Sequence, residues 1–367
     1  MNKKRFLFFV VHPSKYHVFR HTINILKSKG HQVDILITSK DVLEELIKNE
    51  GWEYKNIFPE GRKIAGIPTY LSSGINLLRT IFRLYKYTRK KKYDLFITDD
   101  LLVYIGKLKS VPTIVFTDDD LYVTRLFSIV LSMATHILSP DITNIEKYTN
   151  KKISFPGYKE LAYLHPNVFT PNSDIIKHIN INLKPFFIIR LVSLSAYHDV
   201  GKKGLSNIQV KKLIKVLEAY GNVFISAERN LPNEFEKYRL HIKTSDISHY
   251  LYFAKLFIGD SQTMTSEAAV LGTPSFRCND FVGKISVMEE KEYKYGLTYN
   301  YPPDRFEDML EKINQLLNQK NLEAEFVQKR NKMLNEKINL SLFMIWLFEN
   351  YQKIDFSKKI DFKKFIN

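Results

Sequence analysis

The sequence contains almost no cysteine. Cys278 is the only one among 367 residues, so no disulfide can form within the chain and a zinc site built from four cysteines is excluded. This composition favours a reducing compartment. Glycine and proline are also scarce, at 14 and 13 residues, and we find no internal repeat or low-complexity segment beyond the short basic run at 89–92.

Long apolar runs are missing as well. No window approaches the ~20 apolar residues of a membrane-spanning helix, and the nearest candidate, residues 126–138, is short and contains His136. The N-terminus has the basic and then apolar order of a signal peptide, but the apolar run ends at His12 and is expected to be a buried strand. We therefore expect a soluble cytoplasmic protein, with any membrane contact peripheral and at the inner face.

Acidic residues are fewer than basic residues. The chain has 55 Lys and Arg against 39 Asp and Glu, a formal net charge of +16. Such a charge indicates an anionic partner, namely nucleic acid, an acidic membrane surface or a phosphorylated small molecule. A genome-wide bias toward lysine and asparagine explains it equally well, so charge alone does not choose the partner.

Short apolar runs alternate with helical patterns along most of the chain. The first series lies at 5–11, 33–38, 94–98, 113–116 and 135–139, and the second at 186–193, 222–227, 256–259, 274–276 and 297–299. This alternation predicts two α/β domains with parallel sheets. We expect the domains at 1–175 and 176–335, joined by a connector within 164–185 and followed by a C-terminal helix and basic tail at 336–367.

The segment FIGDSQTMTSEAAVLGTPSF (257–276) predicts a strand that leads directly into a helix. The first amides of such a helix have no intrahelical partner and its dipole favours negative charge, so the helix start can hold a phosphate. Ser261, Gln262 and Thr263 add side-chain donors there. Glu267 cannot complete a capping box because position 264 is methionine; it could accept hydrogen bonds from ribose hydroxyls, and the alternative is a solvated helix glutamate.

Aspartates follow two strands of the first domain, in TDD (98–100) and TDDD (117–120). Carboxylates at the carboxyl ends of parallel strands suit general-base chemistry, so Asp100 and Asp118 are candidate catalytic residues. Helix N-capping is the equal alternative. A metal-binding role for the TDDD aspartates is disfavoured by their position in the first domain.

Three further side chains are candidates for a binding role. Arg190 lies inside an apolar strand, where a charge needs an anionic partner or a salt bridge to a neighbouring acid. His17 and His21 have a spacing that can bind zinc, but no HExxH glutamate lies between them, and we expect no metal site.

The segment GDSQTMTSEAAVLGTPSF resembles the nucleotide-sugar motif of GT-B glycosyltransferases. Over residues 4–320 the chain resembles a GT-B-like family of unknown function related to the non-hydrolysing UDP-N-acetylglucosamine 2-epimerase. The other segments that carry this resemblance are VHPSKYHVFRHTINILKSKGHQV (11–33), IVFTDDD (114–120), FPGYKELAYLHPNVFTPN (155–172) and FIIRLVSLSAYHD (187–199). It implies two Rossmann-like domains whose parallel sheets face a central cleft, a nucleotide sugar such as a UDP-sugar as substrate, and no obligatory cofactor.

The resemblance also implies roles for individual residues. The turn at 261–263 and Arg190 would lie at the diphosphate, and Glu267 at the ribose. His17 would face the cleft as an acceptor-site or acid/base residue, with a helix cap or a surface position as the alternative. His198 resembles a histidine that follows the same strand in the epimerase.

These observations favour a glycosyltransferase that moves a sugar from a nucleoside-diphosphate donor to a cell-envelope or capsular polysaccharide precursor, either a glycan or a lipid-linked acceptor. The first alternative is a nucleotide-sugar 2-epimerase that uses Asp99, Asp100, Asp118 and His198. A noncatalytic nucleic-acid-binding protein is the third hypothesis, and no recognition motif supports it. The basic amphipathic segment 74–94 either covers the sheet or contacts an anionic membrane.

Overall fold

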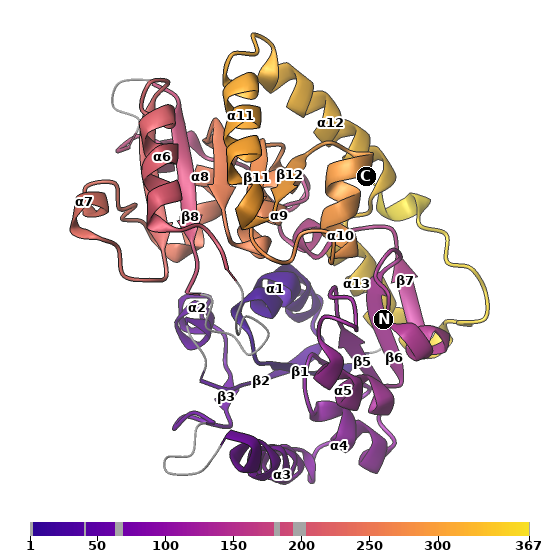
Figure 1. Cartoon of the computed structure of the whole chain (residues 1–367). Helices are drawn as coiled ribbons and strands as arrows, with labels where there is room; N and C mark the ends of the chain where they lie inside the picture. The colour runs from indigo at the N-terminus through magenta and orange to yellow at the C-terminus, as the bar shows by residue number, and fades with distance from the viewer. Residues whose placement is uncertain (1–2, 40–41, 63–68, 180–183, 194–202, 367) are drawn as a thin grey trace. The chain divides into compact units, whose positions relative to one another are not determined.

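The chain folds into two compact units (Figure 1). The computed structural model describes residues 3–39, 42–62, 69–179, 184–193 and 203–366. The first unit contains residues 1–163 and 338–367, and the second contains residues 164–337. Residues 164–175 thus group with the second unit, where the Tyr250 hydroxyl donates to the carbonyl of Ile175 at 3.0 Å.

The first unit is built on a seven-stranded parallel sheet with the order β3-β2-β1-β4-β5-β6-β7. Its strands are β1 (Arg5–Val10), β2 (Gln32–Ile37), β3 (Lys55–Asn56), β4 (Leu95–Thr98), β5 (Thr113–Phe116), β6 (His136–Pro140) and β7 (Lys152–Phe155). Phe6 of the interior strand β1 pairs with Val33 on one side and with Leu95 on the other. Because both faces of β1 are covered, the strand is apolar along most of its length.

Helices cover both faces of this sheet. One face carries α1 (Pro13–Ser28), α2 (Leu43–Asn49) and α13 (Leu340–Asn350). The other carries α3 (Thr69–Thr88), α4 (Leu102–Lys109) and α5 (Ser128–Met133), the last preceded by the 3-10 turn η1 (Arg125–Phe127). Phe6 and Phe8 pack on the first face and Leu7 and Phe9 on the second, as expected for a strand whose side chains alternate.

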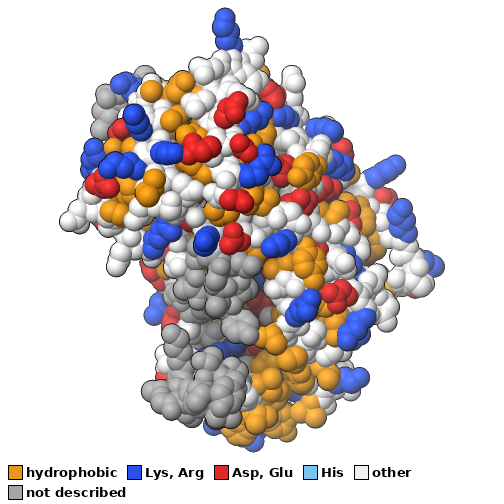
Figure 2. Space-filling view, viewed as in Figure 1, with side chains coloured by type: hydrophobic (Ala, Val, Ile, Leu, Met, Phe, Trp, Pro, Cys, Tyr) orange, Lys and Arg blue, Asp and Glu red, His pale blue; other side chains and the backbone are white. Residues whose placement is uncertain are grey.

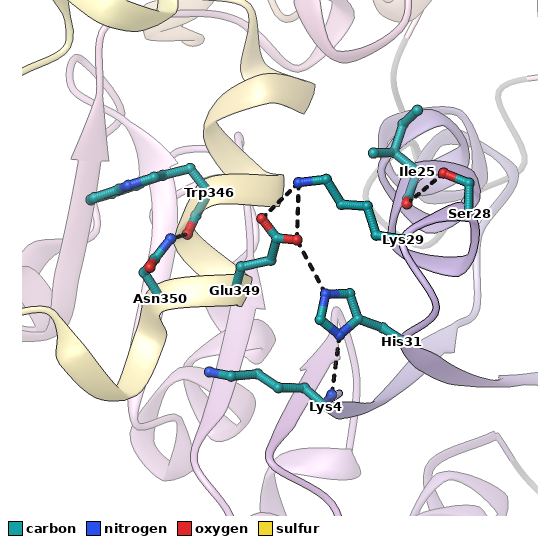
Figure 3. A network of polar contacts seen from close by, with 8 residues as sticks. All are labelled: Lys4, Ile25, Ser28, Lys29, His31, Trp346, Glu349 and Asn350. Atoms are coloured by element: carbon teal, nitrogen blue, oxygen red, sulfur yellow. Dashed lines mark hydrogen bonds and ion pairs between the residues drawn. The ribbon is translucent and has the colours of Figure 1, made fainter. Parts of the chain in front are cut away.

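The C-terminal helix α13 is joined to the rest of the first unit by a partly buried ionic network (Figure 3). Glu349 accepts two hydrogen bonds from Lys29 Nζ, at 2.9 and 3.0 Å, and lies 3.1 Å from Nε2 of His31. The amide of Lys4 donates to Nδ1 of His31 at 3.1 Å, so Nε2 carries the ring proton and donates to Glu349. These contacts connect α13 to the end of α1, although the second unit lies between them in the sequence.

The second unit has a five-stranded parallel sheet with the order β12-β11-β10-β8-β9. The strands are β8 (Phe186–Leu191), β9 (Asn222–Ala227), β10 (Leu256–Gly259), β11 (Ser275–Cys278) and β12 (Thr298–Tyr301). The helices are α6 (Asn207–Leu217), α7 (Asn233–Glu236), α8 (Ile247–Phe253), α9 (Gln262–Leu271), α10 (Ser286–Glu289), α11 (Phe306–Leu317) and α12 (Leu322–Glu336). In the part of the chain that the structure describes, no helix is long and apolar enough to cross a membrane.

Candidate functional site

The start of α9 lies at the carboxyl edge of the second sheet, and two residues separate it from the end of β10. Ser261 is the N-cap: its Oγ accepts from the amide of Met264 at 3.3 Å, and its carbonyl accepts from Oγ1 of Thr265 at 2.6 Å. Among the described residues, the amides of Gln262 and Thr263 have no hydrogen-bond partner. The helix start therefore retains two amide donors and the hydroxyl proton of Ser261 for an anion.

Glu267 lies in the second turn of α9 and is buried, with a relative exposure of 6 %. A solvated helix glutamate, the alternative that the sequence left open, does not fit this position. All residues from Met264 to Leu271 are buried, so α9 is a core helix rather than a surface helix. Gly272 ends the helix with a φ of 88°, a left-handed conformation that favours glycine.

Arg190 forms a salt bridge to a neighbouring acid, which was one of the two possibilities that the sequence offered for this charge. Its Nη2 forms an ion pair with Glu228, and its Nη1 donates to Oγ of Ser226 at 2.7 Å. The Nε atom is buried without a hydrogen-bond partner among the described residues. Arg190 is thus positioned at the end of β8 by a salt bridge, which a bound diphosphate would have to share.

Asp260 was not singled out by sequence reasoning, although it immediately precedes the N-cap. Its side chain is buried, Oδ1 accepts from the amide of Val192 at 2.8 Å, and Oδ2 lies 3.8 Å from Nη1 of Arg229. Burial raises the pKa of Asp260 to about 6, against the opposing effects of the Val192 amide and Arg229. A Cβ atom at position 204 would lie 2.6 Å from Oδ2, so this close backbone approach requires Gly204.

Arg277 of β11 was also missed. Its side chain is completely buried, and none of its three guanidinium nitrogens has a hydrogen-bond partner within the described residues. In the backbone register of the sheet, Arg277 lies beside Gly259, at the end of β10, and beside Asn300 of β12. Burial lowers the pKa of Arg277 to about 10, and Glu289 and Glu292 oppose this shift. The signal that drew attention to Arg190, a charge inside an apolar strand, is equally present in SFRC (275–278).

A second group of charged residues lies in the first unit, at the point where the strand order reverses. The chain leaves β1 toward β2 on one side, whereas β4 continues toward β5 on the other. In open α/β sheets, ligands bind at the carboxyl ends of strands beside such a switch point. Lys15 follows β1, Asp99 and Asp100 follow β4, and Asp118 follows β5.

Asp118 is held between two lysines. Its Oδ1 lies 3.0 Å from Nζ of Lys15, and its Oδ2 lies 2.7 Å from Nζ of Lys159. Burial by itself would raise the pKa of Asp118, but the two ammonium groups prevail and hold it well below its usual range. Asp118 therefore stays ionised at neutral pH and is a poor proton acceptor, so its geometry suits positioning better than base catalysis.

Asp99 and Asp100 have different surroundings. Burial raises the pKa of Asp99 to about 7, with Lys15 opposing the shift and Asp100 adding to it. The Oδ1 atom of Asp99 is buried and has no hydrogen-bond partner in the described part of the chain. Asp100 accepts from Nη1 of Arg62 at 3.0 Å and from the amide of Leu101 at 2.5 Å. Of the three aspartates, Asp99 is the one suited to exchange a proton near neutral pH.

His17 lies in α1 with its ring between Tyr16 and Tyr163, at centroid distances of 5.1 and 5.4 Å. Burial, assisted by Arg20, lowers the pKa of His17 to about 4, so the ring is neutral at pH 7. His198 lies outside the described residues. Within those residues, no group of three or more His, Cys, Asp or Glu side chains is arranged to hold a metal ion.

The fold matches solved structures of nucleotide-sugar enzymes at low sequence identity. A putative UDP-N-acetylglucosamine 2-epimerase from Listeria monocytogenes has a TM-score of 0.71 at 10% identity, covering 99% of this chain and 100% of that chain. The S. aureus MnaA structure with UDP has a TM-score of 0.70 at 12% identity, covering 98% and 100%. The spinosyn forosaminyltransferase SpnP has a TM-score of 0.64 at 14% identity, covering 95% and 100%.

These similarities confirm the predicted GT-B-like fold of two Rossmann-like domains. No curated protein matches the sequence. A family profile matches residues 10–290, which is most of the chain. The chain therefore belongs to the family described as "Protein of unknown function (DUF354)".

Proposed function

We propose that this chain is a glycosyltransferase that moves a sugar from a nucleoside-diphosphate donor to a glycan or lipid-linked precursor of a cell-envelope or capsular polysaccharide. The observation that carries the proposal is the start of α9, where the amides of Gln262 and Thr263 have no hydrogen-bond partner among the described residues and a buried Glu267 follows in the next turn. A UDP-sugar is the expected donor, because solved structures of this fold include one with UDP.

The second unit binds the donor in this proposal. The two amides and the Ser261 hydroxyl donate to the diphosphate, which also gains from the positive end of the helix dipole. As the bond to the sugar breaks, negative charge grows on the leaving diphosphate and these fixed donors stabilise it. The carboxylate of Asp260, when ionised, repels the diphosphate. The guanidinium of Arg229, 3.8 Å from Oδ2 of Asp260, offsets part of the negative charge of this carboxylate. Glu267 accepts hydrogen bonds from the ribose hydroxyls.

The first unit supplies the acceptor side. Asp99 accepts the proton of the acceptor hydroxyl as that oxygen attacks the sugar carbon, because its Oδ1 is unpartnered within the described residues. Lys15 stabilises the ionised form of Asp99, and its ion pair with Asp118 positions the ammonium group. We therefore assign Asp118 a positioning role, with Asp99 as the base in its place.

Calorimetric titration with UDP and a panel of UDP-sugars tests the donor site. We expect wild type to bind at least one of them, and Glu267→Gln to weaken binding by about tenfold or more, because a charged hydrogen-bond acceptor is lost without a change of volume. Glu323→Gln, at an exposed position of α12, is the matched control and should bind as wild type does. Equal affinities for wild type and Glu267→Gln would remove the ribose role from this residue.

A nucleotide-sugar 2-epimerase is the second candidate, and two observations favour it. The structure titled as a putative UDP-N-acetylglucosamine 2-epimerase has a TM-score of 0.71, against 0.64 for the forosaminyltransferase. Asp99, with its pKa raised to about 7, would also suit removal of a carbon-bound proton. An epimerase incorporates solvent deuterium at C2 of its sugar substrate in the absence of an acceptor, and a transferase does not. Proton NMR of each UDP-sugar incubated with the enzyme in D2O separates the two reactions.

A further inference from the structure

The helical layer formed by α3, α4 and η1–α5 in the first unit exposes an unusual number of apolar side chains. Fourteen large apolar side chains are exposed among the described residues, and eight of them lie on these helices. They are Ile75, Leu78, Phe82, Tyr85, Leu108, Leu126, Ile129 and Met133. We call this set the apolar face. Figure 2 shows apolar side chains gathered at the lower end of the visible surface, over the region where Figure 1 labels these helices.

The side chains of the apolar face do not take part in packing the core of the first unit. On α3, Thr80, Leu84 and Thr88 are buried, and Leu84 packs in the core of the first unit. Leu78 and Phe82 recur one turn apart on another side of the same helix, with exposures of 68% and 65%. A helix that only covers a sheet is polar on its outer side, so α3 carries a second apolar stripe that folding does not explain.

The three helices are held together as one surface. Nζ of Lys109, at the end of α4, donates to the carbonyls of Thr88 and Lys91, at the end of α3. The Tyr104 hydroxyl of α4 donates to the carbonyl of Ile129 in α5 at 3.4 Å. The exposed apolar side chains of the second unit, such as Ile208 and Tyr293, lie on separate elements and are the isolated kind that most proteins have.

The segments that carry the apolar face have only positive charges. Residues 69–92, 101–116 and 121–140, which contain the three helices, have no Asp or Glu. Glu60 pairs with Arg79 and Arg83, and Asp34 pairs with Lys91. Exposed basic residues of these segments that have no acidic partner in the described part of the chain are Lys86, Arg89, Lys90, Lys92, Lys107 and Arg125.

We propose that the apolar face and the exposed basic residues of the same segments dock on a lipid bilayer that contains anionic headgroups. Apolar side chains would enter the headgroup boundary, while Lys and Arg contact phosphates, as in helices that lie in the plane of a membrane. A second copy of the chain is a poor occupant, because the same face would meet its own positive charge in a chain of net charge +16. The inference does not depend on the proposed enzymatic reaction.

Co-sedimentation of the full chain with lipid vesicles tests this proposal. Wild type should bind vesicles of mixed phosphatidylglycerol and phosphatidylcholine, but not vesicles of phosphatidylcholine alone. The variant Leu78→Ser/Phe82→Ser and the variant Lys86→Gln/Arg89→Gln/Lys90→Gln should each bind on the order of tenfold more weakly, since one loses apolar burial and the other loses charge. Circular dichroism should show an unchanged fold, because all of these side chains are exposed.

The matched control is Ile208→Ser/Tyr293→Ser, which removes two exposed apolar side chains from the second unit. It should bind the anionic vesicles as wild type does. The proposal is overturned if wild type does not bind anionic vesicles, or if the control loses as much binding as Leu78→Ser/Phe82→Ser. It is also overturned if sedimentation velocity shows a dimer that the Leu78→Ser/Phe82→Ser variant dissociates while vesicle binding is unchanged.

Discussion

Nζ of Lys159 lies 2.7 Å from Oδ2 of Asp118, and both side chains are buried in the first unit. Lys159 begins the 3-10 turn that follows β7, whereas Asp118 follows β5 and its other oxygen is paired with Lys15 of α1. Three segments of the chain thus meet at one carboxylate, at the carboxyl edge of the sheet.

The first prediction concerns the stability that this ion pair contributes. Lys159→Met should lower the free energy of unfolding by about 3 kcal/mol, because it leaves the buried carboxylate of Asp118 with one partner in place of two. Lys159→Met/Asp118→Asn should recover part of the loss, since the buried charge is then removed. Urea unfolding measures both, with exposed Lys55→Met as the control. If the free energy of unfolding of Lys159→Met lies within ~0.5 kcal/mol of the wild-type value, the prediction is contradicted.

The contribution of the Asp118 ion pair to the free energy of unfolding depends on pH. Since the pKa of Asp118 is lowered in the folded state, its contribution is fully present above about pH 4, the pKa of an unfolded aspartate, and is lost as the pH falls through the folded-state pKa. The difference in stability between wild type and Asp118→Asn should therefore shrink only under acidic conditions.

The second prediction concerns Asp99, whose pKa shift has the opposite sign. Between about pH 4 and pH 7 the folded state binds the proton more tightly than the unfolded state does, so stability should fall as the pH rises through this window. Asp99→Asn should remove that slope and be more stable than wild type at pH 8, by on the order of 2 kcal/mol.

Thermal or urea unfolding at pH 5 and pH 8 measures the effect of Asp99→Asn, with exposed Asp304→Asn as the control. The variant should also lose catalytic activity, because an amide cannot accept the proton. A variant that loses stability equally at both pH values would show that Asp99 has a structural role without titrating near neutral pH.

The third prediction concerns Arg277, whose buried guanidinium lacks hydrogen-bond partners among the described residues. Arg277→Met keeps most of the volume and removes a buried charge, so the free energy of unfolding in the absence of ligand should stay the same or rise by about 1 kcal/mol. Exposed Arg305→Met is the control. A fall of more than ~2 kcal/mol would mean that the guanidinium has stabilising partners in the folded protein.

The fold was largely predictable from local patterns. The apolar runs at 186–193, 222–227 and 256–259 correspond to β8, β9 and β10, because buried parallel strands are continuous apolar segments between helices. The start of α9 was predictable for a related reason, since Ser261 is a favoured N-cap residue after a strand.

The candidate site was less predictable, because its properties depend on distances between segments. The sequence shows Asp99, Asp100 and Asp118 as equivalent carboxylates that follow strands. Lys15 and Asp118 are 103 residues apart in the chain yet form an ion pair, and nothing in the pattern around either residue indicates the contact. A salt bridge from Arg190 to a neighbouring acid was one of two hypotheses from the sequence, and nothing in the sequence indicated that the acid is Glu228.

The sequence by itself determined two α/β domains with parallel sheets and a helix that begins directly after a strand at Ser261, because hydrophobic periodicity and capping act over a few neighbouring residues. Only the tertiary structure decided which aspartate is paired with two lysines, which arginine is buried without a hydrogen-bond partner among the described residues, and that α13 packs on the first unit. Electrostatic energy and burial depend on separation in space, and the fold sets that separation between residues far apart in the chain.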